Sequence, residues 1–152
     1  MEKELKRRPI IVADDDADDR FLIGKAMMDS GVKAPIHYLE TGQKLLEHLT
    51  GILGASHPEN RSDLPCLILL DLSMPHLGGR ETLRMIKSFS WLRKIPIVIL
   101  SNSKNPEDVI GSYEDGASSF FVKPLDYQGL VDLMGLLKSY WLQKAEPPFA
   151  DE

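Results

Sequence analysis

The chain has 152 residues and a formal net charge of −5 at pH 7, with 43% hydrophobic and 27% charged residues. These proportions are ordinary for globular proteins and argue against disorder, and the length suggests one domain with enough material for a core. The acidic balance does not favour a nucleic-acid binder, because there is no basic excess to neutralise phosphates.

Three further features indicate where the protein works. The single cysteine, Cys66, cannot form an internal disulfide and fits a reducing compartment. The N-terminus is charged and lacks the apolar stretch of a signal peptide. No run approaches the roughly 18 apolar residues of a membrane-spanning helix. We therefore expect a soluble, cytoplasmic protein that does not associate with a membrane.

The first half of the chain predicts two strands, each followed by a helix. The apolar run at 10–13 indicates a buried strand, and Asp16 can cap the helix that follows it. That helix is expected to end at 29–31, where Asp, Ser and Gly follow one another. A weaker strand at 36–39 precedes an amphipathic helix centred on 45–49.

The second half predicts three more strands, each followed by a helix. The strands are the apolar runs at 66–72, 95–101 and 119–123. The helices are expected near 80–89, after the start signal Asn105-Pro106, and from the cap Asp126 to about Leu142. Five β/α units in sequence predict a parallel sheet with helices on both faces.

The remaining segments are predicted to be loops or tails. Residues 51–65 carry Gly, Pro, Ser and Asn and predict an extended surface connection. We expect a single domain at 9–143, between an N-terminal tail at 1–8 and a C-terminal tail at 144–152. We expect the C-terminal tail to be mobile.

Charged and polar residues follow four of the predicted strands, at the end where binding crevices form in such sheets. They are Asp14 and Asp15, Asp71, Ser101 and Lys123. Three carboxylates about 5 Å apart would repel by roughly 3 kcal/mol per pair at an effective dielectric near 20. A divalent cation removes this repulsion, and carboxylate ligands suit Mg²⁺.

Simpler explanations exist for the individual aspartates and histidines when each is taken alone. Asp16, Asp18 and Asp19 fit helix-capping and solvated acids, and an Asp at a strand end commonly forms a turn. The histidines are scattered without the spacing of metal ligands, and we interpret them as surface or loop residues. They are His37, His48, His57 and His76. The functional signal lies in the combination of groups at the strand ends.

Four segments together resemble the receiver domain of bacterial response regulators, the CheY-like family. The segments are "IIVADDD", "LILLDLSMP", "IVILS" and "GASSFFVKP". The resemblance extends over about residues 9–142 and implies a flavodoxin-like, doubly wound α/β fold. It further implies five parallel strands in the order 2-1-3-4-5. The long connection at 51–65 and the terminal "SYWL" are similar to stand-alone regulators associated with bacterial phytochromes.

The resemblance implies a role for the acids and the lysine at the strand ends. Asp71 would be the phosphoacceptor, and Asp14 and Asp15 would hold Mg²⁺ together with Asp71 and the backbone carbonyl of Ser73. Lys123 would pair with Asp71 beforehand and then contact the phosphoryl group.

The resemblance also implies a conformational switch. Ser101 would donate a hydrogen bond to a phosphoryl oxygen, and Phe120 takes the position of the aromatic switch residue, which is often Tyr. A core Phe that stays fixed is an equally valid interpretation. The bond between Lys123 and Pro124 is cis in the family.

The expected function is that of a response regulator in a two-component phosphorelay. Phosphate would come from a histidine kinase or a histidine phosphotransfer protein, and output would be protein contact or phosphate relay. We expect it to promote only its own phosphoryl transfer and dephosphorylation, not to act as an enzyme on other substrates. Homodimerisation through the last helices remains open. The aromatic residues are either a contact surface or packing residues, namely Trp91, Tyr140, Trp141 and Phe149.

Two alternatives stay open at this point. A Mg²⁺-dependent phosphohydrolase with an Asp nucleophile commonly has a second acid two residues later, where this chain has Ser73. A pseudo-receiver would be a binding module with a silent pocket, which the intact set of site residues argues against.

Overall fold

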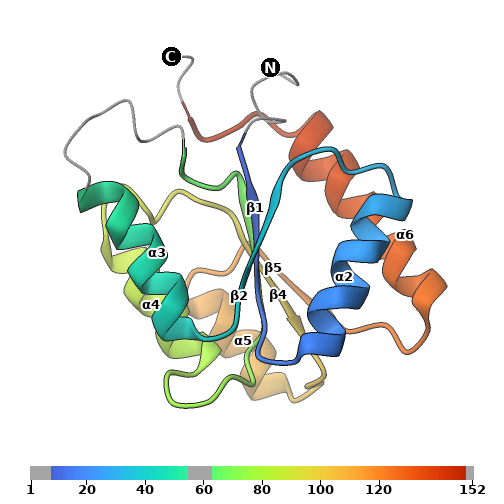
Figure 1. The fold of residues 1–152 in the computed structure, drawn as a ribbon. Coiled ribbons are helices and arrows are strands. Elements are labelled where there is room, and N and C mark those ends of the chain that lie inside the picture. The colour runs from blue at the N-terminus through green and yellow to red at the C-terminus, as the bar shows by residue number, and fades with distance from the viewer. Residues whose placement is uncertain (1–7, 55–62, 150–152) are drawn as a thin grey trace.

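The computed structural model describes residues 8–54 and 63–149, which form a parallel sheet between two layers of helices (Figure 1). The strands are β1 (Ile10–Ala13), β2 (Ile36–Leu39), β3 (Leu67–Leu70), β4 (Ile97–Ser101) and β5 (Ser119–Val122). The helices are α2 (Ala17–Asp29), α3 (Gly42–Gly54), α4 (Gly79–Ser88), α5 (Pro106–Glu114) and α6 (Tyr127–Leu137), which continues into the π-helix η2 (Lys138–Lys144).

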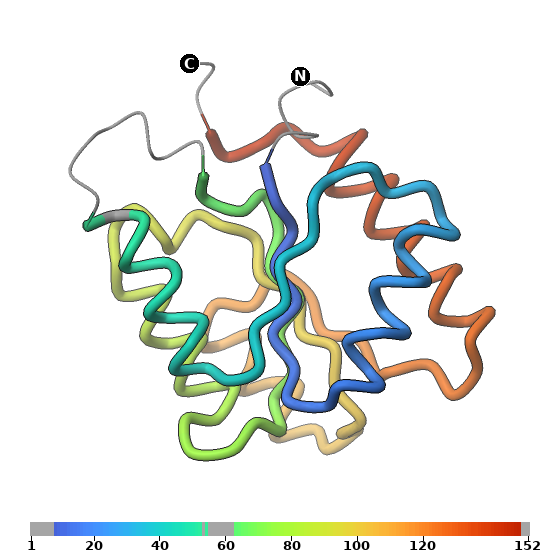
Figure 2. The backbone as a smooth tube through the Cα atoms, in the orientation of Figure 1, coloured from blue at the N-terminus to red at the C-terminus, as the bar shows by residue number. Residues whose placement is uncertain are grey.

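The sheet has the strand order β2-β1-β3-β4-β5, and every neighbouring pair is parallel. This confirms the predicted CheY-like topology. The chain leaves β1, forms α2 and returns to pair β2 beside β1, then crosses to the other half of the sheet (Figure 2). All five strands run in one direction, so their carboxyl ends meet at one edge of the sheet.

Alternate residues of the three central strands face two separate hydrophobic cores, as the period of two requires. One core lies under α2 and α6, on the right of Figure 1. The other lies under α3, α4 and α5. The residues of β1, β3 and β4 are at most 2% exposed, which explains their continuous apolar runs. In contrast, β2 and β5 are edge strands and are only partly buried.

The helix caps predicted from the sequence are present. The Asp16 carboxylate accepts the backbone N–H of Asp18 at 2.8 Å and that of Asp19 at 3.0 Å. The Asn105 side chain accepts a backbone N–H at the start of α5, and Asp126 does the same at the start of α6. These side chains satisfy amide donors that a helix leaves without an internal partner.

Two predictions about connecting segments were wrong in part. Helix α3 continues to Gly54, and Leu64 is fully buried, so 51–65 is not a surface connection throughout. The part of it at 55–62 lies outside the described residues. The described end of the C-terminal tail also packs. Phe149 lies against the core under α3, α4 and α5, and the Arg8 guanidinium carbon is 3.9 Å from the centroid of its ring.

The last helix and its aromatic residues divide between packing and exposure. The predicted helix to Leu142 is α6 followed by η2, and Trp141 packs against the core under α2 and α6. The ring of Tyr140 lies 4.8 Å from that of Trp141 and remains 56% exposed. Throughout the described part of the chain, helices fall short of the length and apolar character needed to cross a membrane.

Candidate metal centre

Three carboxylates converge at the carboxyl ends of β1 and β3. Asp14 directly follows β1 and Asp71 directly follows β3, and the backbone N–H of Asp71 donates to the carbonyl of Ala13 at 2.9 Å. Oxygens of Asp14, Asp15 and Asp71 all lie within 4.8 Å of one another. The residues Asp14 and Asp71 are 2% and 5% exposed, whereas Asp15 faces solvent. The site therefore opens to solvent on the side of Asp15.

Burial leaves these charges poorly compensated. Loss of solvation, followed by the neighbouring charge of Asp14, raises the pKa of the Asp71 carboxyl to about 6. Burial also raises the pKa of Asp14, although the backbone N–H of Asp16 and the Lys123 ammonium oppose this shift. Three carboxylates against one ammonium leave a net negative charge, and hard carboxylate oxygens in such a small cluster fit a divalent cation such as Mg²⁺ or Mn²⁺.

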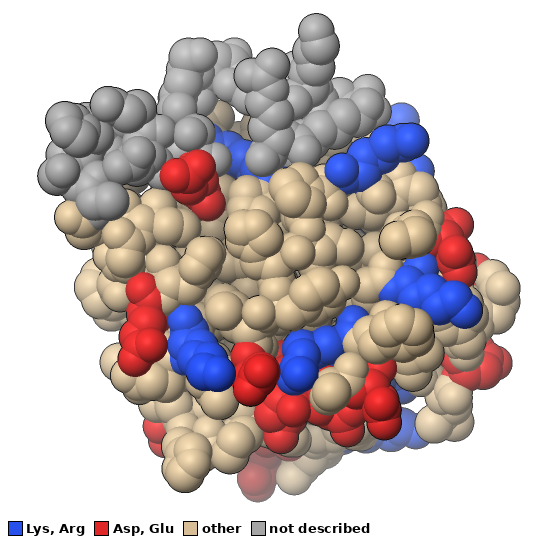
Figure 3. All heavy atoms as spheres, viewed as in Figure 1, with Lys and Arg blue, Asp and Glu red and all other residues tan. Residues whose placement is uncertain are grey.

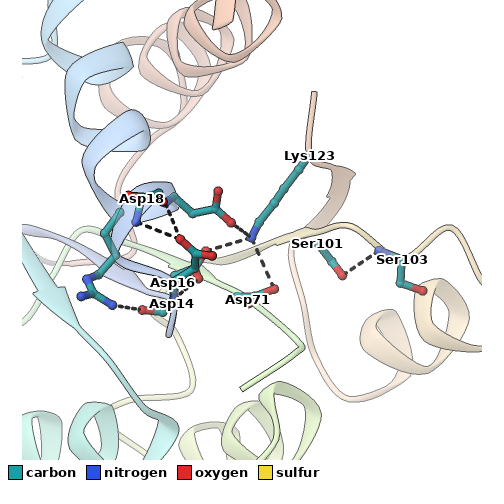
Figure 4. Close-up of polar contacts among 9 residues, drawn as sticks. Asp14, Asp16, Asp18, Asp71, Ser101, Ser103 and Lys123 are labelled. Carbon is teal, nitrogen blue, oxygen red and sulfur yellow. Dashed lines mark hydrogen bonds and ion pairs between the residues drawn. The ribbon is translucent and has the colours of Figure 1, made fainter. Parts of the chain in front are cut away.

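The Lys123 side chain extends from the end of β5 into this cluster (Figure 4). Its Nζ atom donates to Asp14 Oδ2 at 2.9 Å and to Asp19 Oδ2 at 2.8 Å, and it lies 3.8 Å from Asp71 Oδ1. Burial lowers the pKa of the ammonium, but the bonds to Asp19 and Asp14 and the charge of Asp71 raise its pKa above the ordinary value. The structure thus brings Lys123 to the predicted site, with carboxylates other than Asp71 as its nearest partners.

Asp19 was missed as a site residue, since the sequence suggested only a solvated acid in the first turn of α2. Its side chain is 33% exposed and contacts Lys123, whereas the neighbouring Asp18 is exposed. No signal in the sequence separates these two adjacent acids, because the difference depends on the position of β5 relative to α2.

Ser101 is the fully buried last residue of β4, and its hydroxyl belongs to a short network. Its Oγ accepts the backbone N–H of Ser103 at 3.1 Å, as Figure 4 shows. The Ser103 hydroxyl in turn donates to Asp108 Oδ2 at 2.5 Å and accepts the backbone N–H of Asn105 at 3.2 Å. The strand end is thereby joined to the first turn of α5.

The remaining predicted residues lie around the cluster. Ser73 is exposed in the loop after β3, and its backbone N–H bonds to the Asp71 carboxylate and lowers the pKa of that group. Phe120 is partly buried against the core under α3, α4 and α5. The described residues contain no cis peptide bond, so Lys123–Pro124 is trans and the predicted cis bond was wrong. Trans is the lower-energy isomer for an X–Pro bond by about 0.5–1 kcal/mol.

The histidines stand apart from this cluster. His37 of β2 and His48 of α3 lie edge to face, with their ring centroids 5.7 Å apart. The interpretation as surface residues was wrong for His48, which is half-buried with a buried Nε2 atom that has no hydrogen-bond partner among the described residues. His76 adopts φ 64° in the loop after β3, and His57 lies outside the described residues.

Acidic and basic side chains lie next to one another along the lower part of the face in Figure 3. A doubly wound parallel sheet with an acidic cluster and a lysine at its carboxyl edge defines the class of receiver-like α/β proteins. Residues 10–134 match the family model described as the response regulator receiver domain. The chain belongs to this family and is a response regulator receiver domain of two-component signalling systems.

Two relatives are similar in sequence to most of this chain. The response regulator Rcp1 of Synechocystis is 33% identical over 93% of this chain and 92% of its own length. A probable methanogenesis regulatory protein, FilR2 of Methanothrix harundinacea, is 32% identical over 88% of this chain and 83% of its own.

Two solved structures are similar in fold over nearly the full chain. The phosphorylated cyanobacterial phytochrome response regulator RcpA superimposes with a TM-score of 0.82 at 29% identity, covering 94% of this chain and 99% of that one. A Mn²⁺-bound form of Rcp1 gives a TM-score of 0.78 at 30% identity, covering 93% of this chain and 99% of that one.

Proposed function

We propose that the protein is a cytoplasmic response regulator that is phosphorylated on Asp71 in the presence of Mg²⁺. The observation that carries the proposal is the cluster of Asp14, Asp15 and Asp71, whose oxygens lie within 4.8 Å of one another, with the Lys123 ammonium against it. The Mn²⁺-bound structure of Rcp1 and the phosphorylated structure of RcpA support it, because both proteins are similar to this chain over nearly its full length.

The chemistry is an in-line transfer of a phosphoryl group. An Asp71 carboxylate oxygen forms a bond to phosphorus while the bond from phosphorus to the donor, such as a phosphohistidine nitrogen, breaks, and the donor leaves with that electron pair. A carboxylate is a weak nucleophile, so positioning and charge neutralisation must supply the rate. A cation held by Asp14, Asp15, Asp71 and the Ser73 carbonyl would supply charge neutralisation at the phosphoryl oxygens.

The residues of the chain supply the remainder of the stabilisation. Lys123 lies close enough to Asp71 to contact a phosphoryl group attached there after a small movement. Ser101 can donate its hydroxyl proton to a phosphoryl oxygen, since that hydroxyl is the acceptor in its bond with the Ser103 amide. Phosphorylation replaces one negative charge on Asp71 with about two and adds acceptor oxygens, which attract both donors.

Output would follow from the movement of β4 and its neighbours. Ser101 is hydrogen-bonded through its carbonyl to the Lys123 amide, and Phe120 pairs with Ile99 one strand across, so both lie on strands that the phosphoryl group would pull. The affected surface would comprise α5, β5 and α6. We infer that this surface signals through protein contact or phosphate relay, and homodimerisation through the last helices is one form such contact could take.

A phosphorylation assay with a small-molecule donor tests the proposal. We expect incubation with acetyl phosphate and Mg²⁺ to add one phosphoryl group by intact mass, at a site that peptide mapping assigns to Asp71. Asp71→Asn should abolish this gain. A modification that survives Asp71→Asn would contradict the site, and no modification of the wild-type protein would favour the pseudo-receiver.

The same preparation addresses partner and enzyme alternatives. A histidine kinase or phosphotransfer protein labelled with ³²P should lose label to the wild-type protein and retain it with Asp71→Asn. Continuous release of phosphate from phosphate esters would instead indicate a phosphohydrolase. The place of a general acid two residues after Asp71 is taken by Ser73, which cannot protonate a leaving group as a carboxylic acid does.

A further inference from the structure

The Lys123 ammonium leans away from the proposed phosphoacceptor and toward helix α2. Its Nζ atom is 2.8 Å from Asp19 Oδ2 and 2.9 Å from Asp14 Oδ2, but 3.8 Å from Asp71 Oδ1. The last distance exceeds the range of an N–H···O hydrogen bond. An ammonium has three donors, so two are committed to Asp14 and Asp19 and the third does not reach Asp71.

Both ends of the contact between Asp19 and Lys123 are fixed by backbone hydrogen bonds. The Asp19 amide donates to the capping carboxylate of Asp16 at 3.0 Å, which holds the first turn of α2 in place. The Lys123 amide donates to the Ser101 carbonyl at 2.8 Å, which holds the end of β5 against β4. The ion pair therefore joins two fixed backbone positions and restricts the movement of the long lysine side chain between them.

The proposed reaction requires Lys123 to direct a donor toward the phosphoryl group. A phosphoryl oxygen on Asp71 needs a donor within hydrogen-bonding distance, and two of the three donors of the ammonium are directed at Asp14 and Asp19 instead. Cation binding would engage Asp14, which leaves Asp19 as the partner that still retains the ammonium. Asp19 thus competes with the phosphoryl group for the same donor.

We propose that Asp19 is a positioning residue that restrains Lys123 in the unphosphorylated protein and so slows phosphorylation of Asp71. The proposal rests on the function proposed above. The pair is partly solvated, with the two side chains 33% and 11% exposed, so its effect is modest. Loss of the pair should change the rate by about twofold to fivefold, the range of partly exposed ion pairs.

The chain supplies a matched control in Asp18, the preceding acid in the same helical turn. Asp18 and Asp19 carry the same charge, and both amides bond to the cap Asp16. Within 8–54 and 63–149, Asp18 takes part in no ion pair, whereas Asp19 contacts Lys123. Asp18→Asn and Asp19→Asn therefore remove equal charge at the same helix end, and only the second removes the lysine contact.

The experiment compares phosphorylation rates of the full chain by acetyl phosphate at saturating Mg²⁺, followed by intact mass. We expect Asp19→Asn to be faster than the wild type by about twofold to fivefold and Asp18→Asn to match the wild type. Asp19→Ala and Asp18→Ala repeat the comparison without an amide that could still accept from Lys123. Saturating Mg²⁺ removes any contribution of altered cation affinity, and a purely structural role would change the thermal midpoint without raising the rate.

The outcomes separate this inference from the proposed function. Equal rates for the Asp18 and Asp19 variants, or slower phosphorylation of both Asp19 variants, would overturn the restraint while leaving Asp71 as the acceptor. Failure of the wild-type protein to accept phosphate would overturn the proposed function and the restraint with it.

Discussion

Gly79 packs directly against the backbone of Asp71. A Cβ atom at position 79 would collide with the carbonyl oxygen of Asp71 and would lie 2.5 Å from the Cα atom of Leu72. Helix α4 begins at Gly79, and the Gly79 amide donates to the Leu72 carbonyl at 3.0 Å. The close approach of the helix start thus determines the path of the loop that follows Asp71.

Gly79→Ala should therefore destabilise the protein and displace the Asp71 loop. The colliding atoms belong to the backbone and cannot rotate away, so we expect a loss of about 1–3 kcal/mol in the free energy of unfolding. Urea denaturation measures this loss, and slower phosphorylation by acetyl phosphate would report the displacement.

Gly78→Ala is the matched control for that prediction. Gly78 is the N-cap of α4 at φ −67°, a conformation open to alanine, and no atom of the described residues lies within 4 Å of a Cβ atom there. We expect it to lose less than about 1 kcal/mol. Equal losses for the two variants would show that the close approach to Asp71 does not determine the effect.

The stability of the protein without Mg²⁺ should depend on the ionisation of Asp71. Its pKa is about 6 in the folded chain, above the value of 3.8 expected without burial, so the folded state binds this proton more tightly than the unfolded state. The carboxylate therefore destabilises the fold, fully above about pH 6, and this destabilisation disappears as the pH falls from 6 toward 4. A shift of about two pKa units corresponds to roughly 3 kcal/mol.

Asp71→Asn removes this ionisation and should reveal it. In the presence of a chelator, the variant should be more stable than the wild type at pH 8 by up to about 3 kcal/mol. The difference should shrink toward zero at pH 4, because the wild-type side chain is then also neutral. Denaturation curves for both proteins across this pH range provide the measurement. A gap that stays constant, or a variant that is less stable at pH 8, would contradict the raised pKa.

Mg²⁺ should stabilise the folded protein through the acidic cluster. At a concentration ten times its dissociation constant, a ligand that binds only the folded state adds about 1.4 kcal/mol. Thermal unfolding during a Mg²⁺ titration should show this rise for the wild type and a weaker one for Asp15→Asn, which loses one of the three clustered carboxylates. Asp18→Asn should retain the full response, since Asp18 lies outside the cluster. Equal responses of the two variants would argue against Asp15 as a ligand.

The sequence was sufficient to predict the strands and their order because the signals for them are local or short in range. Three central strands are buried on both faces and form continuous apolar runs, and the caps Asp16, Asn105 and Asp126 mark where helices start. Topology then places the residues after β1, β3, β4 and β5 at one edge, which is why Asp71 and Lys123 could be predicted to lie together.

Predictions that depended on tertiary contacts were less successful. The ion pair of Asp19 joins residues 104 positions apart, and nothing in the neighbourhood of Asp19 distinguishes it from Asp18. The tail residue Phe149 packs because Arg8 and the core lie beside it, although its position near the end of the chain suggested mobility. In each case the deciding partner is distant in the chain.

The hydrogen bond between Ser103 and Asp108 should stabilise the protein, because it joins the first turn of α5 to the end of β4. The Ser103 hydroxyl donates to Asp108 Oδ2 at 2.5 Å, and the Ser103 amide donates to Ser101 Oγ. We expect Ser103→Ala and Asp108→Ala each to lower the free energy of unfolding by about 1–2 kcal/mol, because a hydrogen bond to a charged acceptor is lost. The double variant should lose less than the sum, by at least about 0.5 kcal/mol, since both changes remove the same bond.

The cycle of Ser103→Ala with Glu107→Ala is the control, because Glu107 shares the first turn of α5 without bonding to the Ser103 side chain. Additive losses in both cycles would show that the hydroxyl does not couple these two elements.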